Sequence, residues 1–259
     1  MSRIAANAKL TWSLHVTGVR PDGRHLLEAE MVTLDLCDAL ELVATDDDHP
    51  RFSARAEAPA GPIDAELGAD DLIRRALRLV GRRAHVELVK RIPRGAGLGG
   101  GSADAAAVLR WAGTSDPSVA IELGSDVPFC CVGGRAVVRG VGELIEPLTA
   151  IARTVTLAIP SIHVDTASCY RAFDGLGRAQ QRHPRNDLTA AAERVAPELA
   201  AVRQLLEERA GADFVLAGSG SAHFCEGNPL GLGTGLIEVV ETTSGPVRLL
   251  LATTTGTEG

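Results

Sequence analysis

Short runs of alternating hydrophobic and polar residues begin the chain. Residues 8–16 place leucine and tryptophan side chains on one side and Lys9 and Thr11 on the other. This alternation predicts a half-buried strand with Lys9 and Thr11 on its polar face. Residues 29–44 alternate again and predict paired strands. Between the two runs, residues 17–25 contain one proline and two glycines, which predicts a turn.

Helical periodicity follows a polar stretch. Residues 46–62 are polar and contain several prolines and alanines, which predicts a surface loop or hairpin. Residues 70–80 carry apolar side chains spaced for one helix face, with aspartates at the start and a glycine after the end. A strand at residues 85–89 leads through a glycine-rich loop to a second predicted helix, residues 102–111, for which Ser102 is a suitable N-cap.

The second half of the chain also mixes strands and helices. A fresh strand begins near residue 154, and the boundary before it predicts two domains, residues 1–150 and 151–259. The predicted elements are a hairpin at 133–142, strands at 154–160 and 213–217, helical regions at 166–173 and 189–209, a glycine turn at 218–221, and then a strand and a helix before a last strand at 247–252.

Composition and charge narrow the class of protein. The 259 residues are 45% hydrophobic and 23% charged, as in a soluble globular protein. The net charge of -7 gives no general attraction for nucleic acid or an anionic membrane, so local groups must bind any anionic ligand. Because no apolar run is long enough to span a membrane and no signal-peptide core is present, we expect a cytoplasmic protein. The five cysteines form no CxxC pair, which predicts reduced thiols.

Lysine is nearly absent from the chain. Of the 26 basic residues only Lys9 and Lys90 are lysines, and the other 24 are arginines. The lysine ammonium is a compact point charge, whereas the arginine guanidinium is a planar fork, so the two are not interchangeable at a reacting centre. Lys9 is therefore a candidate functional group.

Five glycines lie between Gly95 and Gly101, directly before the alanine-rich helix. Glycine allows positive φ angles and lets a ligand approach the backbone closely. A helix that starts after such a loop presents free N–H groups and the positive end of its dipole. The stretch therefore favours phosphate binding, although a tight strand-to-helix turn also requires small residues.

Several stretches, in order, resemble the GHMP superfamily of small-molecule kinases, which is named for galactokinase, homoserine kinase, mevalonate kinase and phosphomevalonate kinase. Within it, the chain resembles the branch whose members phosphorylate 4-diphosphocytidyl-2-C-methyl-D-erythritol in the methylerythritol phosphate route to isoprenoids. The resembling stretches are Ala8-Lys9-Leu10, Leu14 to Gly18, Asp22-Gly23-x-His25, Leu34-Asp35-Leu36, Gly97 to Ala106, Leu123 to Phe129, Gly140 to Glu143, Asn186-Asp187-Leu188 and Ala217 to Ser221.

The resemblance implies an α+β, two-domain GHMP kinase fold, with an N-terminal domain like ribosomal protein S5 domain 2 and a ferredoxin-like C-terminal domain. It implies ATP and Mg²⁺ as cofactors, a small-molecule substrate, no nucleic-acid or membrane partner, and a monomer or homodimer. The residues implied to bind the ATP phosphates are Pro93, Gly95, Gly97, Leu98, Gly99, Gly100, Gly101, Ser102 and Ala103, with the Ser102 hydroxyl near Mg²⁺.

The resemblance also implies roles around the acceptor. Asp126 resembles the base that takes the proton of the substrate hydroxyl, and Lys9 resembles the cation that keeps this carboxylate ionised. His25 resembles the residue that hydrogen-bonds the cytosine edge, and Tyr170 resembles an aromatic that stacks on that base. Taken alone, His25 is compatible with a surface histidine, Tyr170 with a core residue and Asp126 with a turn former.

Two residues depart from the family pattern. Thr11 stands where the family usually has asparagine, and a hydroxyl replaces only part of an amide's hydrogen bonding. Arg24 stands where the family usually has tyrosine, and its guanidinium can stack with Tyr170 on a base. We therefore expect a kinase for the cytidylyl substrate. The alternatives are a related kinase with a different acceptor and a member that binds nucleotide without turnover.

Overall fold

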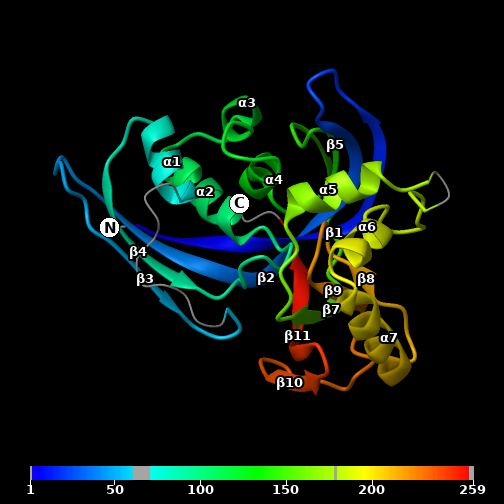
Figure 1. Cartoon of the computed structure of the whole chain (residues 1–259). Coiled ribbons are helices and arrows are strands. Elements are labelled where there is room, and N and C mark those ends of the chain that lie inside the picture. The colour runs from blue at the N-terminus through cyan, green and yellow to red at the C-terminus, as the bar shows by residue number, and fades with distance from the viewer. Residues whose placement is uncertain (1, 61–70, 178–179, 257–259) are drawn as a thin grey trace.

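A long antiparallel ribbon, β1 (Ser2–Val19) and β2 (His25–Ala44), forms the centre of the fold (Figure 1). This computed structural model describes residues 2–60, 71–177 and 180–256. Strand β1 extends beyond the predicted run at both ends and β2 extends beyond it at its start, and the predicted turn closes the hairpin between them. Three register shifts bend the ribbon, one of them between Asn7 and Lys9 and one between Thr11 and Ser13. These irregularities flank the segment that carries Lys9 and Thr11, as bulges near functional sites often do.

The remaining strands join this ribbon into one connected sheet. Its main path runs β3-β4-β2-β11-β7-β9-β8, while β1 pairs with β2, β10 pairs with β11, and β5 pairs with both β2 and β6. The bounds are β3 (Phe52–Ala56), β4 (Ala84–Lys90), β5 (Arg135–Gly140), β6 (Leu144–Leu148), β7 (Thr154–Pro160), β8 (Val215–Leu216), β9 (His223–Glu226), β10 (Ile237–Thr242) and β11 (Gly245–Thr255).

Helices cover the sheet on the side that holds the glycine loop. They are α1 (Leu72–Leu79), α2 (Gly100–Trp111), α3 (Pro117–Ala120), α4 (Val127–Val132), α5 (Thr166–Asp174), α6 (Thr189–Val195) and α7 (Glu198–Ala210). In Figure 1, α1 and α2 lie over the β1–β2–β4 part of the sheet, and α7 lies beside β7, β8 and β9. The small alanine side chains of α2 are buried and let this helix pack closely in the core.

The N-termini of α1 and α2 show which of the predicted cap residues cap a helix. The Asp71 side chain accepts a hydrogen bond from the Arg74 N–H at 2.9 Å, as expected for an N-cap; Asp70 lies outside the described residues. The predicted Ser102 cap is wrong. Helix α2 begins at Gly100 because Gly99, in the left-handed conformation, occupies the cap position, which leaves Ser102 within the first turn.

Two other local predictions are wrong, and the predicted helical region at 189–209 is interrupted. The segment expected to be a loop or hairpin contains β3, which pairs in parallel with β4. The helical region at 189–209 is broken at Pro197, because proline lacks the N–H needed to continue the first helix. The helix expected before the last strand is the strand β10, which pairs along β11. Tertiary pairing overrides local propensity at β3 and β10.

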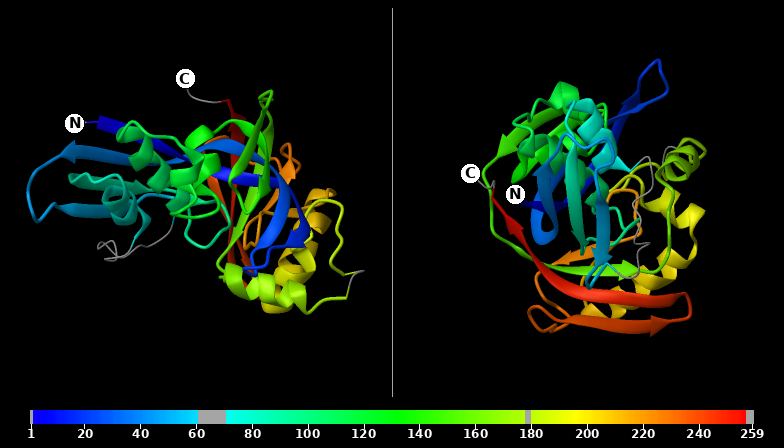
Figure 2. Two further views of the ribbon diagram at one scale, coloured as in Figure 1. Left: turned by 90° about the horizontal axis from the view of Figure 1, so that it is seen from above. Right: turned by 90° about the vertical axis from the view of Figure 1, so that its left-hand side faces the viewer.

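Strand β11 returns across the predicted boundary at residue 150. It pairs with β7 and continues to pair with β2 through Thr254 and Thr255. Figure 2 shows β11 as a long strand that reaches from the C-terminal part towards the N-terminal part. The division into two domains at this residue stays a prediction.

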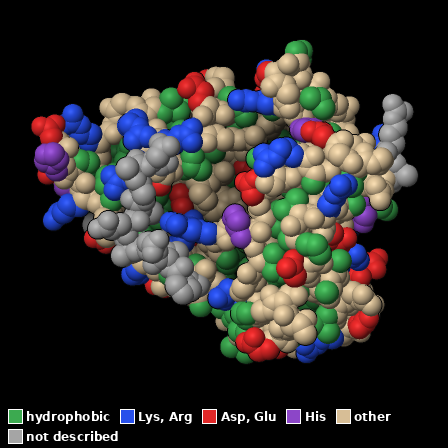
Figure 3. Space-filling model, in the orientation of Figure 1, with side chains coloured by type: hydrophobic (Ala, Val, Ile, Leu, Met, Phe, Trp, Pro, Cys, Tyr) green, Lys and Arg blue, Asp and Glu red, His purple; other side chains and the backbone are tan. Residues whose placement is uncertain are grey.

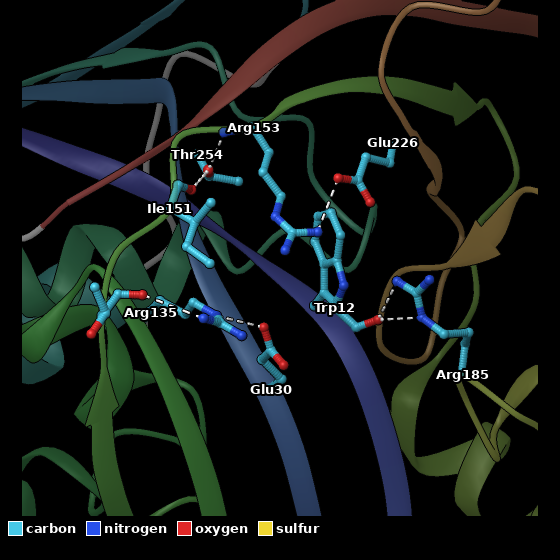
Figure 4. A network of polar contacts seen from close by, with 9 residues as sticks. Trp12, Glu30, Arg135, Ile151, Arg153, Arg185, Glu226 and Thr254 are labelled. Carbon is cyan, nitrogen blue, oxygen red and sulfur yellow. Dashed lines mark hydrogen bonds and ion pairs between the residues drawn. The ribbon is translucent and has the colours of Figure 1, made fainter.

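Polar contacts reinforce this junction (Figure 4). The Arg185 guanidinium donates two hydrogen bonds to the Trp12 carbonyl, at 3.0 and 3.2 Å, and lies 5.3 Å from the centre of the indole ring. Arg153 lies 5.1 Å from the same ring and pairs with Glu226 at 2.9 Å. The strand that carries Lys9 and Thr11 is thereby anchored to the second half of the chain.

Candidate active site

A cavity of about 970 Å³ opens between the glycine loop, the β1–β2 hairpin and α5. Figure 3 shows this face of the molecule hollowed near its centre, with acidic and basic side chains around the hollow. The sequence-predicted residues that line the cavity are Lys9, Thr11, Arg24, His25, Pro93, Gly95, Gly97, Leu98, Gly99, Gly100, Gly101, Ser102, Asp126 and Tyr170. The fold therefore gathers almost all the predicted site residues around one space.

Two glycines allow the loop to pack against its neighbours. Gly97 has a φ of 76°, and a Cβ there would lie 2.3 Å from the carbonyl oxygen of Ala217. Gly99 has a φ of 68°, and a Cβ there would lie 2.6 Å from Lys9 Cγ. Both positions therefore need glycine for conformation and for space.

Backbone hydrogen bonds tie the loop to both halves of the chain. The Lys9 N–H donates to the Leu98 carbonyl at 3.0 Å, and the Ala222 N–H donates to the Ala96 carbonyl at 3.0 Å. The second predicted glycine turn, residues 218–221, thus lies against the first loop. Its contact with the loop explains why two glycine stretches far apart in sequence belong to one site.

The first turn of α2 faces the cavity with free backbone donors. Gly100, Gly101 and Ser102 line the cavity, and the first N–H groups of a helix have no partner within the helix. The Ala103 N–H donates to the Gly99 carbonyl at 2.8 Å, and its side chain is buried. Ala103 is not among the residues that line the cavity, and its predicted contact with the ATP phosphates stays a prediction. The arrangement suits a phosphate group.

Lys9 and Asp126 form an ion pair on the wall of this cavity. Lys9 Nζ lies 3.1 Å from Asp126 Oδ2 and donates a hydrogen bond to Thr11 Oγ at 3.1 Å. The Lys9 side chain is 6% exposed and the Asp126 side chain 30%, so the lysine is buried behind a carboxylate that reaches the cavity. Asp126 precedes α4 but makes no capping hydrogen bond. Its carboxylate is thus available for chemistry and does not serve as a turn former.

The hairpin and α5 close the other end of the cavity. The His25 ring stacks on Tyr170 with centroids 4.7 Å apart, and its Nε2 lies 2.7 Å from Asp174 Oδ1. Burial and the nearby Asp126 carboxylate raise the pKa of Tyr170. Arg24 lies at the rim with a 65% exposed side chain, 4.0 Å from Asp22. His25, Tyr170, Asp174 and Arg24 together provide an aromatic surface and charged hydrogen-bonding groups at this end of the cavity.

Similarity to known proteins agrees with this geometry. Residues 69–134 match the model of the GHMP kinases N-terminal domain. The chain is 36% identical to the 4-diphosphocytidyl-2-C-methyl-D-erythritol kinase of Sinorhizobium medicae, over 85% of this chain and 84% of that protein. It is equally similar to the enzyme of that name from Chromobacterium violaceum, at 36% identity over the same shares. The chain belongs to the 4-diphosphocytidyl-2-C-methyl-D-erythritol kinase family.

Solved structures support the fold of this kinase family member. A crystal structure of 4-(cytidine 5'-diphospho)-2C-methyl-D-erythritol kinase matches with a TM-score of 0.70 and 29% identity, covering 98% of this chain and 100% of that one. A mevalonate kinase structure matches with a TM-score of 0.63 at 11% identity, which shows the shared fold. The protein is an ATP-dependent kinase of a small molecule with the predicted α+β GHMP kinase fold.

Sequence reasoning missed a buried charge cluster in this kinase. Lys90 donates hydrogen bonds to Asp38 and Asp104, and all three side chains are 5% exposed or less. Burial raises the pKa of Asp104 to about 7, even though Lys90 acts in the opposite direction. Burial alone would lower the pKa of Lys90, but the two carboxylates raise it. The scarcity of lysine was the signal, since Lys90 is the second of only two.

The Asn186-Asp187-Leu188 motif has a positioning part in the site. Asn186 Nδ2 donates to the carbonyls of Leu216 and Gly218, at 2.8 and 2.7 Å. Asp187 accepts a hydrogen bond from the Val16 N–H at 3.0 Å. The motif therefore holds the second glycine turn against β1.

The remaining expectations concern cysteines and membranes. The four buried cysteines, Cys130, Cys131, Cys169 and Cys225, are free thiols. Among the described helices, none is both long and apolar enough to cross a membrane. A cytoplasmic location stays a prediction.

Proposed function

We propose that this kinase transfers the γ-phosphoryl group of ATP to the 2-hydroxyl of 4-diphosphocytidyl-2-C-methyl-D-erythritol. The observation that carries the proposal is the 3.1 Å ion pair between Lys9 and Asp126, in the same cavity as the glycine loop. The relatives that cover most of the chain bear the name of this activity.

In the proposed reaction Asp126 accepts the proton of the attacking hydroxyl. A general base must lie within hydrogen-bond reach of its proton, and the 30% exposed carboxylate reaches the cavity. Lys9 directs the carboxylate, because its buried ammonium lies 3.1 Å from Asp126 Oδ2. Thr11 fixes the ammonium from the other side. Thr11 thus acts through Lys9, and its predicted direct contact with substrate stays a prediction.

Phosphoryl transfer depends mainly on positioning and on stabilising negative charge. The free N–H groups at Gly100, Gly101 and Ser102 are suited to hold the phosphates of ATP. The lysine ammonium adds a positive charge next to the acceptor. The glycine loop and Lys9 therefore supply complementary parts of one charge-stabilising site.

Mg²⁺ fits this site as an ion carried by ATP. The described residues contain no group of three or more His, Cys, Asp or Glu side chains that could hold a metal. Mg²⁺ usually binds through one or two carboxylates together with substrate phosphates. The Ser102 hydroxyl lines the cavity and is the oxygen donor that we assign to it. When bound, the ion neutralises charge on the phosphates.

The cytidine part of the substrate is assigned to the His25 end of the cavity. Tyr170 supplies an aromatic face, and His25 supplies a ring nitrogen at a position set by Asp174. Arg24 at the rim can stack on a base or contact a phosphate. These three residues are the proposed basis of acceptor choice.

A coupled assay of ADP release tests the proposal. The purified protein is given ATP, Mg²⁺ and one acceptor at a time: the cytidylyl substrate, galactose, mevalonate or homoserine. Turnover with the cytidylyl substrate alone supports the proposed function. Turnover with another acceptor would establish a related kinase with a changed pocket, and ATP binding without any turnover would establish a member that only binds nucleotide.

A further inference from the structure

A buried cluster of three charged side chains lies at the base of the glycine loop. Asp38 comes from β2, Lys90 ends β4, and Asp104 lies in the second turn of α2. Lys90 Nζ donates to Asp104 Oδ2 at 2.6 Å and also to Asp38 Oδ2. The ammonium therefore links two carboxylates that are 66 positions apart in the sequence.

Asp38 extends this link to the backbone at the start of the loop. Its Oδ1 accepts hydrogen bonds from the N–H groups of Arg91 at 2.5 Å and Ile92 at 2.8 Å. The residues that enter the loop are thus held by Asp38, and the helix that leaves it is held through Asp104. The glycine residues between them have the greatest backbone freedom, so the loop by itself does not fix the distance between its ends.

We propose that Lys90 is a positioning residue for nucleotide binding, which joins both ends of the glycine loop through Asp38 and Asp104. This inference rests on the proposed function only in taking the loop as the phosphate site. By holding Ile92 and α2 at a fixed separation, the cluster orders the free N–H groups of the first helical turn before ATP arrives. Such preorganisation lowers the ordering cost of binding.

The space around Lys90 explains why this basic residue is a lysine in an arginine-rich chain. A Cβ added to Gly100 would lie 3.0 Å from Lys90 Nζ and 3.0 Å from Ile92 Cγ2. The ammonium is therefore packed directly beneath the first residue of α2. A planar guanidinium is larger and needs a wider site.

Stability of the core alone would favour apolar side chains at these positions over a buried charge cluster. Asp104 Oδ1 is buried and has no hydrogen-bond partner among the described residues. Replacing a buried ion pair with apolar residues of similar size is often neutral or stabilising. The positioning role and a purely structural role therefore predict different behaviour for an apolar replacement.

The test compares a double variant, Lys90→Met with Asp104→Leu, with the parent enzyme. The double change removes one positive and one negative charge, and it leaves Asp38 bonded to the loop backbone. The measurements are the Kd of the non-hydrolysable ATP analogue AMP-PNP by calorimetry, KM for ATP and for the acceptor, kcat, and the thermal midpoint. Asp104→Asn is the conservative variant, because its amide oxygen still accepts from Lys90. Glu193→Gln, which breaks the remote Arg203–Glu193 pair, is the control for loss of an ion pair.

We expect the double variant to bind AMP-PNP about tenfold more weakly and to raise KM for ATP by a similar factor. KM for the acceptor and kcat should stay within about threefold, while the thermal midpoint of the double variant should fall because Asp38 stays buried without the Lys90 charge. Asp104→Asn and Glu193→Gln should bind AMP-PNP within about twofold of the parent. Asp104→Leu alone keeps the Lys90–Asp38 ion pair, so it provides the test if the double variant does not fold. It should weaken AMP-PNP binding at least threefold.

Unchanged AMP-PNP affinity in a folded Asp104→Leu or double variant would overturn the inference, as would a fall in thermal midpoint without loss of affinity. The binding measurement needs no acceptor. An enzyme that binds AMP-PNP but does not use the cytidylyl substrate would therefore overturn the proposed function while leaving this test intact.

Discussion

The imidazole of His25 stacks on the phenol ring of Tyr170, with centroids 4.7 Å apart and planes inclined by 28°. His25 begins β2 and Tyr170 lies in α5, so the contact joins the hairpin to the helix across the cavity. Asp174 Oδ1 lies 2.7 Å from His25 Nε2 and holds the ring in this position. Because His25 covers one face of Tyr170, a cytosine that stacks on Tyr170 must use the other face or displace His25.

Replacing Tyr170 should weaken binding of the cytidylyl acceptor. Stacking of a base on an aromatic side chain contributes roughly 1–3 kcal/mol. Tyr170→Leu should therefore raise KM for the acceptor about tenfold or more, with KM for ATP unchanged. Tyr170→Phe keeps the ring and should stay within about threefold in steady-state assays. Equal KM values for the two variants would remove Tyr170 from the proposed base site.

Asp126→Asn should abolish most of the turnover. Loss of a general base costs on the order of 10²- to 10⁴-fold in rate, and asparagine cannot take up the proton. The side chain keeps its size, so AMP-PNP affinity by calorimetry should stay within about threefold. A near-normal kcat would show that the base assignment is wrong.

Thr11→Val should reduce kcat about tenfold. The valine keeps the shape of this buried side chain but cannot accept the hydrogen bond from Lys9 Nζ, so the ammonium is held by Asp126 alone. Thr11→Ser retains the hydroxyl and serves as the control. If both variants had the parent kcat in saturating ATP and acceptor, the hydroxyl would have no part in holding Lys9.

Gly99→Ala should inactivate the enzyme. Its new Cβ would lie 2.6 Å from Lys9 Cγ in a backbone with a φ of 68°, so the loop or Lys9 must move. Gly113 is the matched control, because it has a φ of 82° but no atom within 4 Å of an added Cβ. Gly113→Ala should lower stability by about 1 kcal/mol with activity retained. Steady-state rates and thermal midpoints of both variants separate the two effects.

Protonation of His223 should lower the free energy of unfolding as the pH falls below 6.5. Burial, with the nearby Arg203 charge, lowers its pKa from 6.5 to about 4 in the folded protein. Between these values the unfolded chain binds more protons than the folded one, so unfolding becomes easier as the pH falls from 6.5 to about 4. The full effect is about 3 kcal/mol at 1.36 kcal/mol for each pH unit.

The measurement is urea unfolding of the parent and of His223→Leu at pH 7.5 and pH 5. The difference in unfolding free energy between the two proteins isolates His223 from other titrating groups, including Asp104. The parent should lose more stability than the variant on acidification. A difference that does not change with pH would contradict the buried, neutral histidine.

Much of the fold was predictable because its signals are local. Alternating residues predicted the β1–β2 ribbon, and the aspartate before α1 predicted its cap. The glycine stretch predicted a phosphate loop, and Lys9 and Asp126 were identified from their motifs before their ion pair was known. Short-range backbone preferences and short motifs determine these features.

Other features depended on partners far away in the sequence. Local propensity placed a helix where β10 forms, because it does not include the hydrogen bonds that β11 offers. Ser102 has the chemistry of a cap, but the packing of Gly99 against Lys9 sets the start of α2 one turn earlier.

The sequence by itself determined which chemical groups this kinase possesses: a glycine loop, two lysines and one carboxylate in a recognisable motif. The resemblance implied that Lys9 meets Asp126, but only the tertiary structure gave the distance and burial of that pair and decided that Lys90 meets Asp38 and Asp104. The physical reason is that buried charges are stable only with partners, and the strands and helices that bring those partners together are paired over long range.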